Sequence, residues 1–242
     1  MTKTYDATEH REDFFIAVKN GKMGIIDKNG EPLTEFIYDY YADGDEHMFC
    51  GICNKIIPMK YNGKWGVLDR NCNKIADFIY DDIFCNNDYS FVTLNNKKGV
   101  IDNKGKLIVE IKYDDIEPME IGCLSKVRIG DKFGYIDHNG KEVIESKYDY
   151  LFYDGWDLIL ATKDSLTGFI DTNNNTVIDF KYELDTRMGF YNRDFSLAKL
   201  NGKYGIINRQ GKTLIDFIYD DIDIDNNPIT ASIDNEQITL DI

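Results

Sequence analysis

The chain has 242 residues, of which 43% are hydrophobic, with sixteen tyrosines and fourteen phenylalanines. This composition suffices for a buried core and excludes an intrinsically disordered chain. The formal charge of −15 argues against a nucleic-acid ligand, because phosphate binding needs clustered lysines and arginines. No run approaches the length of a membrane span, and the N-terminal residues lack the apolar core of a signal peptide, so we expect a soluble, cytoplasmic protein.

The cysteines also favour a cytoplasmic protein. They are five in number, cluster in the first half and follow no repeat: Cys50, Cys53, Cys72, Cys85 and Cys123. An odd, irregular set suits reduced thiols better than a disulfide framework. We therefore expect a reducing compartment.

The chain is a repeat protein. In six copies a glycine is followed fourteen residues later by a tyrosine: Gly24 and Tyr38, Gly66 and Tyr80, Gly99 and Tyr113, Gly134 and Tyr148, Gly168 and Tyr182, Gly205 and Tyr219. We call the glycine of each pair the key glycine. Positions within a copy are numbered from it, with the key glycine itself as position 0. Self-similarity with a period near 35 predicts one array, a single β-repeat domain spanning residues 1–242.

The repeat begins in mid-unit, because Tyr5-Asp6 and the apolar run 14–19 resemble the end of one copy and the start of the next. Each copy then reads as an apolar run, an Asn-Gly type turn, a short run holding the key glycine, a second turn and a third run. Such turns between β-branched runs are hairpin signals. The pattern predicts units of three or four short strands, with minimal helix.

The third run of each copy alternates. Positions 10, 12 and 14 are mostly apolar or aromatic, as in Val109, Ile111 and Tyr113, which predicts one strand face in a core. Position 13 is lysine in three copies and isoleucine in the other three. We therefore expect an outward face that is polar in half of the units and partly covered in the rest.

The spacing between key glycines is 42, 33, 35, 34 and 37 residues, which places an insertion at about residues 41–56. After Tyr219 the runs 229–233 and 237–242 resemble the first two strands of a partial seventh unit.

The predicted fold is therefore an all-β array of seven units. A closed, propeller-like ring is favoured, because Tyr5 begins a series of seven tyrosine positions and residues 1–6 would supply the strand that the last unit lacks. The alternative is an open, twisted β-solenoid.

One copy carries a family signature. Trp65-Gly66, with Lys64, the run 67–69 and the later run 78–81, resembles the bacterial WG repeat, which is named after this dipeptide. The resemblance extends over nearly the whole chain through the spacing, although the tryptophan position is elsewhere Met23, Lys98, Phe133, Thr167 and Tyr204. It implies a β-rich bacterial repeat domain and supplies no catalytic residues. We interpret the key glycine as structural, allowing a bulge or a close backbone approach.

Acids recur at three places. Position 3 is aspartate in five copies and Asn208 in the last, which predicts an Asx turn in which the side chain accepts a nearby backbone N–H. Position 15 is acidic in every copy, and we expect it to cap the turn after the strand. Position 16 is acidic only at Asp82, Asp115 and Asp221, which makes it the better candidate for a binding surface.

No metal, cofactor or catalytic residue is predicted. Residues 221–225 resemble the start of an EF-hand loop, but Asn226 stands where glycine is needed and Ser232 where the bidentate glutamate is needed. His47, Cys50 and Cys53 make only half of a zinc site. The three histidines occupy unrelated positions, and none belongs to a nucleophile motif.

A binding module is therefore favoured over an enzyme. We expect a protein partner with a basic surface, and an immunity or inhibitor protein for a cognate toxin is the most concrete such role. The candidate partner-binding residues are Asp43, Asp45, Glu46, Asp82, Asp115, Asp221, Asp223 and Asp225. The alternatives are a small-ligand or carbohydrate-binding protein, or an enzyme with its site at the centre of the repeat ring. A deep pocket with convergent polar groups would favour these alternatives.

Overall fold

The computed structural model describes residues 5–11, 14–40, 56–85, 88–117, 124–153, 157–185, 187–190, 194–226 and 228–241. These residues form strands and turns, and no helix occurs among them. The predicted all-β fold is confirmed. Contacts gather the chain into two compact units, Met1–Asp115 and Ile116–Ile242. Within the described ranges no helix is long and apolar enough to cross a membrane.

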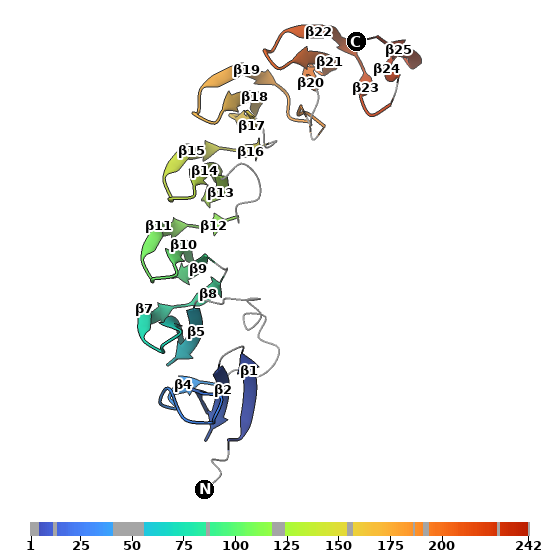
Figure 1. The fold of residues 1–242 in the computed structure, drawn as a ribbon. Helices are drawn as coiled ribbons and strands as arrows, with labels where there is room; N and C mark the ends of the chain where they lie inside the picture. Colours follow the sequence, from blue (N-terminus) through green and yellow to red (C-terminus); the bar gives the residue numbers. More distant parts are fainter. Residues whose placement is uncertain are drawn as a thin grey trace. The chain divides into compact units, whose positions relative to one another are not determined.

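The first unit contains three antiparallel sheets, in the strand orders β1-β2-β3-β4, β5-β6-β7 and β11-β10-β9-β8 (Figure 1). Its strands are β1 (Ala7–Arg11), β2 (Phe14–Lys19), β3 (Lys22–Ile26), β4 (Tyr38–Asp39), β5 (Ile56–Tyr61), β6 (Lys64–Asp69), β7 (Lys74–Tyr80), β8 (Asp82–Cys85), β9 (Tyr89–Leu94), β10 (Lys97–Asp102) and β11 (Leu107–Tyr113).

The second unit contains four antiparallel sheets, in the orders β12-β13-β14-β15, β16-β17-β18-β19, β20-β21-β22 and β23-β24-β25. Its strands are β12 (Asp115–Ile116), β13 (Leu124–Ile129), β14 (Lys132–Asp137), β15 (Glu142–Tyr148), β16 (Tyr150–Tyr153), β17 (Leu158–Lys163), β18 (Leu166–Asp171), β19 (Thr176–Tyr182), β20 (Phe195–Leu200), β21 (Lys203–Asn208), β22 (Thr213–Tyr219), β23 (Asp221–Asp223), β24 (Ile229–Ile233) and β25 (Glu236–Leu240). Sheets of three or four strands agree with the predicted repeat unit.

In the sheets of four strands, the second and third strands form a tight hairpin. The sheets β5-β6-β7 and β20-β21-β22 comprise the second to fourth strands of this pattern, and β23-β24-β25 comprises the first to third, so every sheet contains the hairpin. The three runs of each copy in the sequence are thus its second, third and fourth strands. In the β9–β10 turn, Asn95 and Asn96 have φ of 52° and 61°, and Asn201 and Gly202 of the β20–β21 turn have 51° and 77°. Two consecutive residues with positive φ are typical of the type I′ turn, whose twist matches that of the strands. The predicted hairpins are confirmed.

The key glycine lies in the third strand, where the fourth strand bulges over it. Tyr204 pairs with Tyr219 and Ile206 with Ile215, so the single Gly205 faces three residues of β22. A Cβ at Gly205 would lie 2.7 Å from the carbonyl oxygen of Ile215, and the nearest atom in the six copies lies 2.5–3.1 Å away. In five copies this distance is below 3.0 Å, so a side chain there would displace the fourth strand or, at Gly66, the ring of Phe78. These contacts confirm both the bulge and the close approach.

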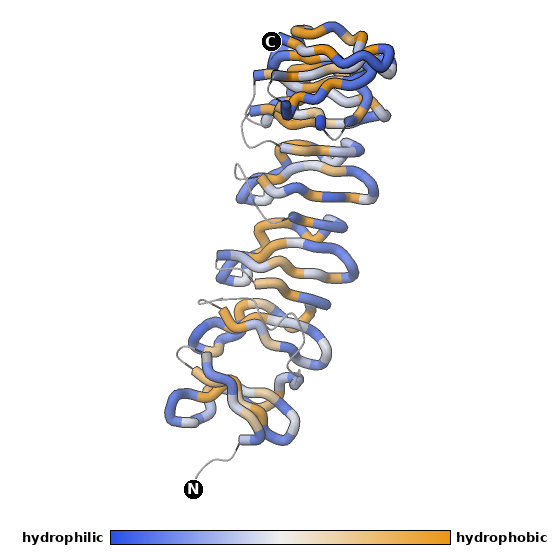
Figure 2. The backbone as a smooth tube through the Cα atoms, turned by 90° about the vertical axis from the view of Figure 1, so that its right-hand side faces the viewer, coloured by the Kyte–Doolittle hydropathy of each residue, from blue (hydrophilic) through white to orange (hydrophobic). Residues whose placement is uncertain are grey.

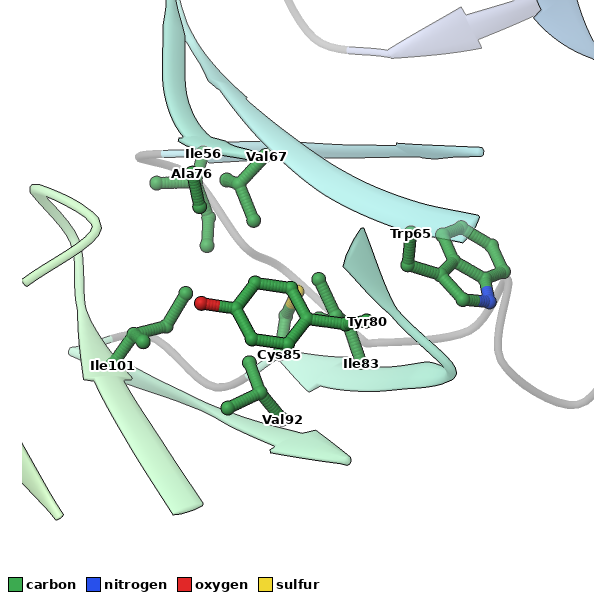
Figure 3. Close-up of a cluster of buried hydrophobic side chains, with 9 residues drawn as sticks. All are labelled: Ile56, Trp65, Val67, Ala76, Tyr80, Ile83, Cys85, Val92 and Ile101. Carbon is green, nitrogen blue, oxygen red and sulfur yellow. The ribbon is translucent and has the colours of Figure 1, made fainter. Parts of the chain in front are cut away.

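The core lies between successive sheets of a unit. In the cluster of Figure 3, the ring of Tyr80 from β7 lies among side chains of its own sheet and of the next one, including Ile83, Val92 and Ile101. Position 14 is buried in the first five copies, and position 10 in the four central ones. Figure 2 shows that hydrophobic stretches recur along the chain and are separated by hydrophilic ones. The predicted inward face is thus confirmed.

The tyrosine at position 14 also stacks on the next sheet. Its ring contacts the aromatic residue at position 12 of the following copy, with centroids 5.5–6.1 Å apart, in Tyr5–Phe36, Tyr38–Phe78, Tyr148–Phe180 and Tyr182–Phe217. The hydroxyl of Tyr148 donates a hydrogen bond of 2.7 Å to Oδ1 of Asn174 in the next turn. The fixed spacing of the tyrosine therefore reflects a contact between copies.

Isoleucine at position 13 is partly covered and partly open to solvent, as expected for the outward face. Ile37, Ile79 and Ile218 are 39%, 46% and 48% exposed. Position 13 points outward because it alternates with the inward-facing positions of the strand. The fourth strand therefore presents some apolar area to solvent.

Replacing Gly168 with alanine should lower the free energy of unfolding by about 3 kcal/mol, at the upper end of the usual cost of overpacking. The added Cβ would lie 2.5 Å from the carbonyl oxygen of Ile178. Gly202→Ala is the matched control, because a Cβ there meets nothing within 4 Å and suffers only from the φ of +77°, a strain of about 1 kcal/mol. Urea unfolding measures both, and equal losses would contradict the steric role of the key glycine.

Candidate functional site

The acid at position 15 joins one repeat to the next. Oδ2 of Asp81 accepts the backbone N–H of Asn95 at 2.6 Å, and Oδ2 of Asp220 accepts that of Asp234 at 2.9 Å. Each of these donors lies in the hairpin turn of the following sheet. The acid caps a turn, as predicted, but the turn is the hairpin of the next repeat and not the one that directly follows its own strand. We call this contact the inter-repeat clamp.

A lysine at position −2 completes the clamp. Lys203 Nζ lies 2.5 Å from Oδ1 of Asp220, and Lys22 Nζ lies 2.8 Å from Oδ1 of Asp39. Lys64 likewise binds Asp81. The lysine and the acid are seventeen residues apart, a spacing that the sequence analysis did not use.

The fifth copy varies both partners together. Leu166 replaces the lysine and Glu183 replaces the aspartate. The longer Glu183 still reaches the next hairpin, where Oε1 accepts the N–H of Gly202 at 2.7 Å, and Lys199 lies 3.5 Å from Oε2. The backbone contact is thus kept where the ion pair changes, which indicates that the turn cap is the essential part.

The clamp lowers the pKa of its carboxyl group. For Asp81 and Asp220 the hydrogen bond from the lysine is the largest cause, and the N–H of the next turn adds to it, so both pKa values lie below the ordinary 3.8. Both groups favour the ionised form in the folded state.

The acid at position 3 forms the predicted Asx turn in all six copies. Oδ1 of Asp27 accepts the backbone N–H of Asn29 and of Glu31 at 2.8 Å each. The last copy makes the same two bonds with Asn208, at 3.0 Å to Gln210 and 2.9 Å to Lys212. The carboxylate of this position therefore serves the local turn.

The acids at position 16 lie at the start of first strands and make local contacts. Asp115 Oδ1 lies 2.6 Å from Nζ of Lys98, and Asp221 Oδ1 lies 2.9 Å from Nη1 of Arg187. Asp82 Oδ1 accepts the N–H of Ile83. Asp115, the last residue of the first unit, is thus ion-paired within that unit, and Asp221 is ion-paired within the second unit.

The remaining predicted residues divide into two groups. Asp223 Oδ1 accepts the N–H of Asp225 at 3.0 Å, as in an Asx turn, and Oδ2 accepts from the side chain of Asn226 at 2.9 Å. No group of three or more metal-ligating side chains gathers within the described ranges. Outside those ranges lie Asp43, Asp45, Glu46, His47, Cys50 and Cys53.

Arg187 organises a polar cluster that the sequence analysis missed. Its guanidinium contacts both carboxylate oxygens of Asp185 at 3.2 Å, and it lies 4.9 Å from the ring centroid of Tyr204. Burial raises the pKa of Asp185, but the bonds from Arg187 and Tyr204 outweigh it and leave the pKa below its ordinary value. This cluster joins the segment after β19 to Asp221 of β23.

A second missed feature is the acid at position 11. It is present in all six copies and exposed in every one: Glu35, Asp77, Glu110, Glu145, Asp179 and Asp216. It lies in the bulge, where Asp216 is one of the three residues opposite Gly205. Three of these acids contact an exposed lysine of their own strand, in Asp77–Lys74, Glu110–Lys112 and Glu145–Lys147. Counting every position of the repeat would have found it.

The clamp predicts a pH-dependent stability difference between the wild type and Asp81→Asn. Because the folded pKa of Asp81 lies below the unfolded 3.8, its stabilisation is complete above that value and disappears as the pH falls through the folded pKa. Urea unfolding should show the variant less stable at pH 7 and the difference closing below about pH 4. Asp77→Asn, which removes a charge four residues away, serves as control. A difference that is the same at every pH would contradict the prediction.

The repeat pattern of the chain matches a known family model. The family model of the WG containing repeat matches residues 23–43, 65–97, 99–133, 133–165, 168–204 and 204–229. No curated protein matches the chain. Among solved structures, Kluyveromyces lactis Hsv2 is similar at 12% identity and a TM-score of 0.32, over 84% of this chain and 73% of that one. Apo AztD from Citrobacter koseri is similar at 12% identity and a TM-score of 0.36, over 93% and 79%. Since the family model covers most of its length, the chain belongs to the WG containing repeat family.

Proposed function

We propose that this chain is a non-enzymatic repeat module that binds a protein with a basic surface. The observation that carries the proposal is the exposed acid at position 11 of all six copies. The acids at position 3 cap local turns, and those at position 15 form the inter-repeat clamps. By contrast, three of the position 11 acids contact an exposed lysine of their own strand. Exposed pairs of this kind contribute little to stability.

The same strand face also offers apolar area. Beside Asp216 on β22, Leu214 and Ile218 are 42% and 48% exposed, and beside Asp179 on β19, Val177 is 41% exposed. Interfaces combine apolar contact with charges that steer encounter and fix the orientation of the partner. A partner with lysines or arginines beside aliphatic residues would match this face.

Within this class, an immunity or inhibitor protein for a basic toxin is the most specific role that we propose. A chain of charge −15 attracts a basic partner over a distance and speeds association at low salt. The acids predicted from the sequence, Asp82, Asp115 and Asp221 together with the acidic segment 43–46, would add to the same field. Ion pairing of Asp115 and Asp221 places them second to the position 11 acids in this proposal.

Of the alternatives, carbohydrate binding through the repeated tyrosines is disfavoured by their burial, since Tyr113 and Tyr182 are each only 1% exposed. A sugar platform needs aromatic faces that are open to solvent. Small-ligand binding and an enzymatic site at a ring centre stay predictions.

Closure of the array into a ring also stays a prediction. The strand that would receive a closing strand in the seventh sheet is β25, which has β24 as its one neighbour within the described residues. The side chains of β25 are therefore the ones that a closing strand would meet.

The proposal predicts that loss of the position 11 acids slows partner binding. Glu145→Gln, Asp179→Asn and Asp216→Asn together should lower the association rate constant by about tenfold at low salt, and flatten its salt dependence, because rim charges act mainly on encounter. The partner is recovered by pull-down from native lysate and mass spectrometry, and its binding kinetics are measured at low and high salt.

Two triple variants that remove the same charge serve as controls. The first combines Asp131→Asn, Asp164→Asn and Asp234→Asn, at three exposed hairpin turns. It should leave the association rate constant nearly unchanged. Asp82→Asn, Asp115→Asn and Asp221→Asn test the position 16 acids and should have an intermediate effect. Equal effects of the three triple variants would mean that the acids act only through the net charge of the chain. Unchanged binding kinetics in the position 11 variant would contradict the proposal.

A further inference from the structure

The third strand of the seventh sheet differs from its counterparts at the position of the key glycine. In the hairpin β24–β25, Ala231 pairs with Ile238, as Ala198 pairs with Gly205 in β20–β21. Ile238 therefore occupies position 0 of the seventh copy, and it is 37% exposed. The structural register, rather than sequence similarity, makes this assignment.

Position 0 has no room for a side chain once a fourth strand is in place. A Cβ at Gly168 would lie 2.5 Å from the carbonyl oxygen of Ile178, and one at Gly66 would lie 2.7 Å from the ring of Phe78. Isoleucine would add three further carbon atoms to that Cβ. A fourth strand with the bulge of β7 or β19 therefore cannot cross β25.

A second residue of β25 opposes the same docking. Glu236 stands at position −2, where five copies carry the lysine of the clamp. In those copies the lysine binds the acid at the end of the fourth strand, as Lys203 binds Asp220 at 2.5 Å. On β25 the incoming acid would face a carboxylate, and like charges at such a distance repel.

We infer that β25 is a terminating strand, which rejects any fourth strand of this repeat type, whether it comes from the same chain or from a second copy. An unpaired strand edge is a template for further pairing, and head-to-tail pairing that does not close produces fibres. The repeat pairs its fourth strand through the key glycine at position 0 and the lysine at position −2. In β25 these residues are replaced by Ile238 and Glu236. The seventh sheet thereby acts as a cap of the array.

The test uses a labelled synthetic peptide with the sequence of residues 210–221, which contains β22 with its bulge and the clamp acid Asp220. The wild type should not bind it at β25. The double variant Glu236→Lys, Ile238→Gly restores the lysine and the glycine, and should bind at least about tenfold more tightly than the wild type, because removing an overpacked side chain and a like charge both favour docking. Fluorescence anisotropy measures the affinity, and hydrogen exchange of the β25 amides locates the site.

The matched control is Glu236→Lys, Thr239→Gly, which has the same charge and an equally flexible strand but keeps Ile238. It should behave as the wild type does. Unchanged exchange protection of β24 in all three proteins shows that the seventh sheet is folded. Binding of the peptide to wild-type β25, or an affinity of the double variant no higher than that of the control, would overturn the inference.

Discussion

The repeats depend on a carboxylate that reaches out of one sheet and binds the backbone of the next. Asp81 and Asp220 each accept a backbone N–H from the following hairpin and an ammonium hydrogen bond from their own sheet. A turn amide that points into solvent would otherwise be satisfied only by water. Because the donor belongs to the next copy, this bond fixes the position of that hairpin relative to the strand that ends at the acid. The hydrophobic core lies between the two sheets that the bond joins.

The bulge over the key glycine supplies the geometry for this bond. It curves the fourth strand, so that the tyrosine at position 14 and the acid at position 15 end next to the following sheet. Position 11 points outward by the ordinary alternation of the strand, away from the contacts that hold the repeats together. One strand therefore carries the residues that join the repeats and, on its other face, the exposed acids.

The acids of the chain illustrate how composition becomes structure. A net charge of −15 suggests an undivided acidic surface. In the structure the position 3 acids serve turns, the position 15 acids serve clamps, and two position 16 acids are paired, one with Lys98 and one with Arg187. The outward acids at position 11 are a smaller and better defined set, and the proposed binding role rests on this set.

Much of the fold could be predicted from spacing alone. The period, the hairpins, the inward face of the third run and the structural role of Gly66 all follow from local patterns, since turn chemistry and alternation act over a few residues. The clamp could not be predicted in detail, because Asp81 and Asn95 belong to different copies and their contact depends on how two sheets pack. The significance of Ile238 required the register of β24 and β25.

Hydrogen exchange at the capped turn amides tests the central claim most directly. The account predicts that the amides of Asn95 and Asp234, although they lie in exposed turns, exchange at least about tenfold more slowly than unstructured amides, because each is bonded to a carboxylate of the preceding repeat. In the variant Asp81→Ala the amide of Asn95 should lose this protection, while that of Asp234 keeps it. Exchange of Asn95 at the unstructured rate in the wild type, or at the same slow rate in the variant, would contradict the account.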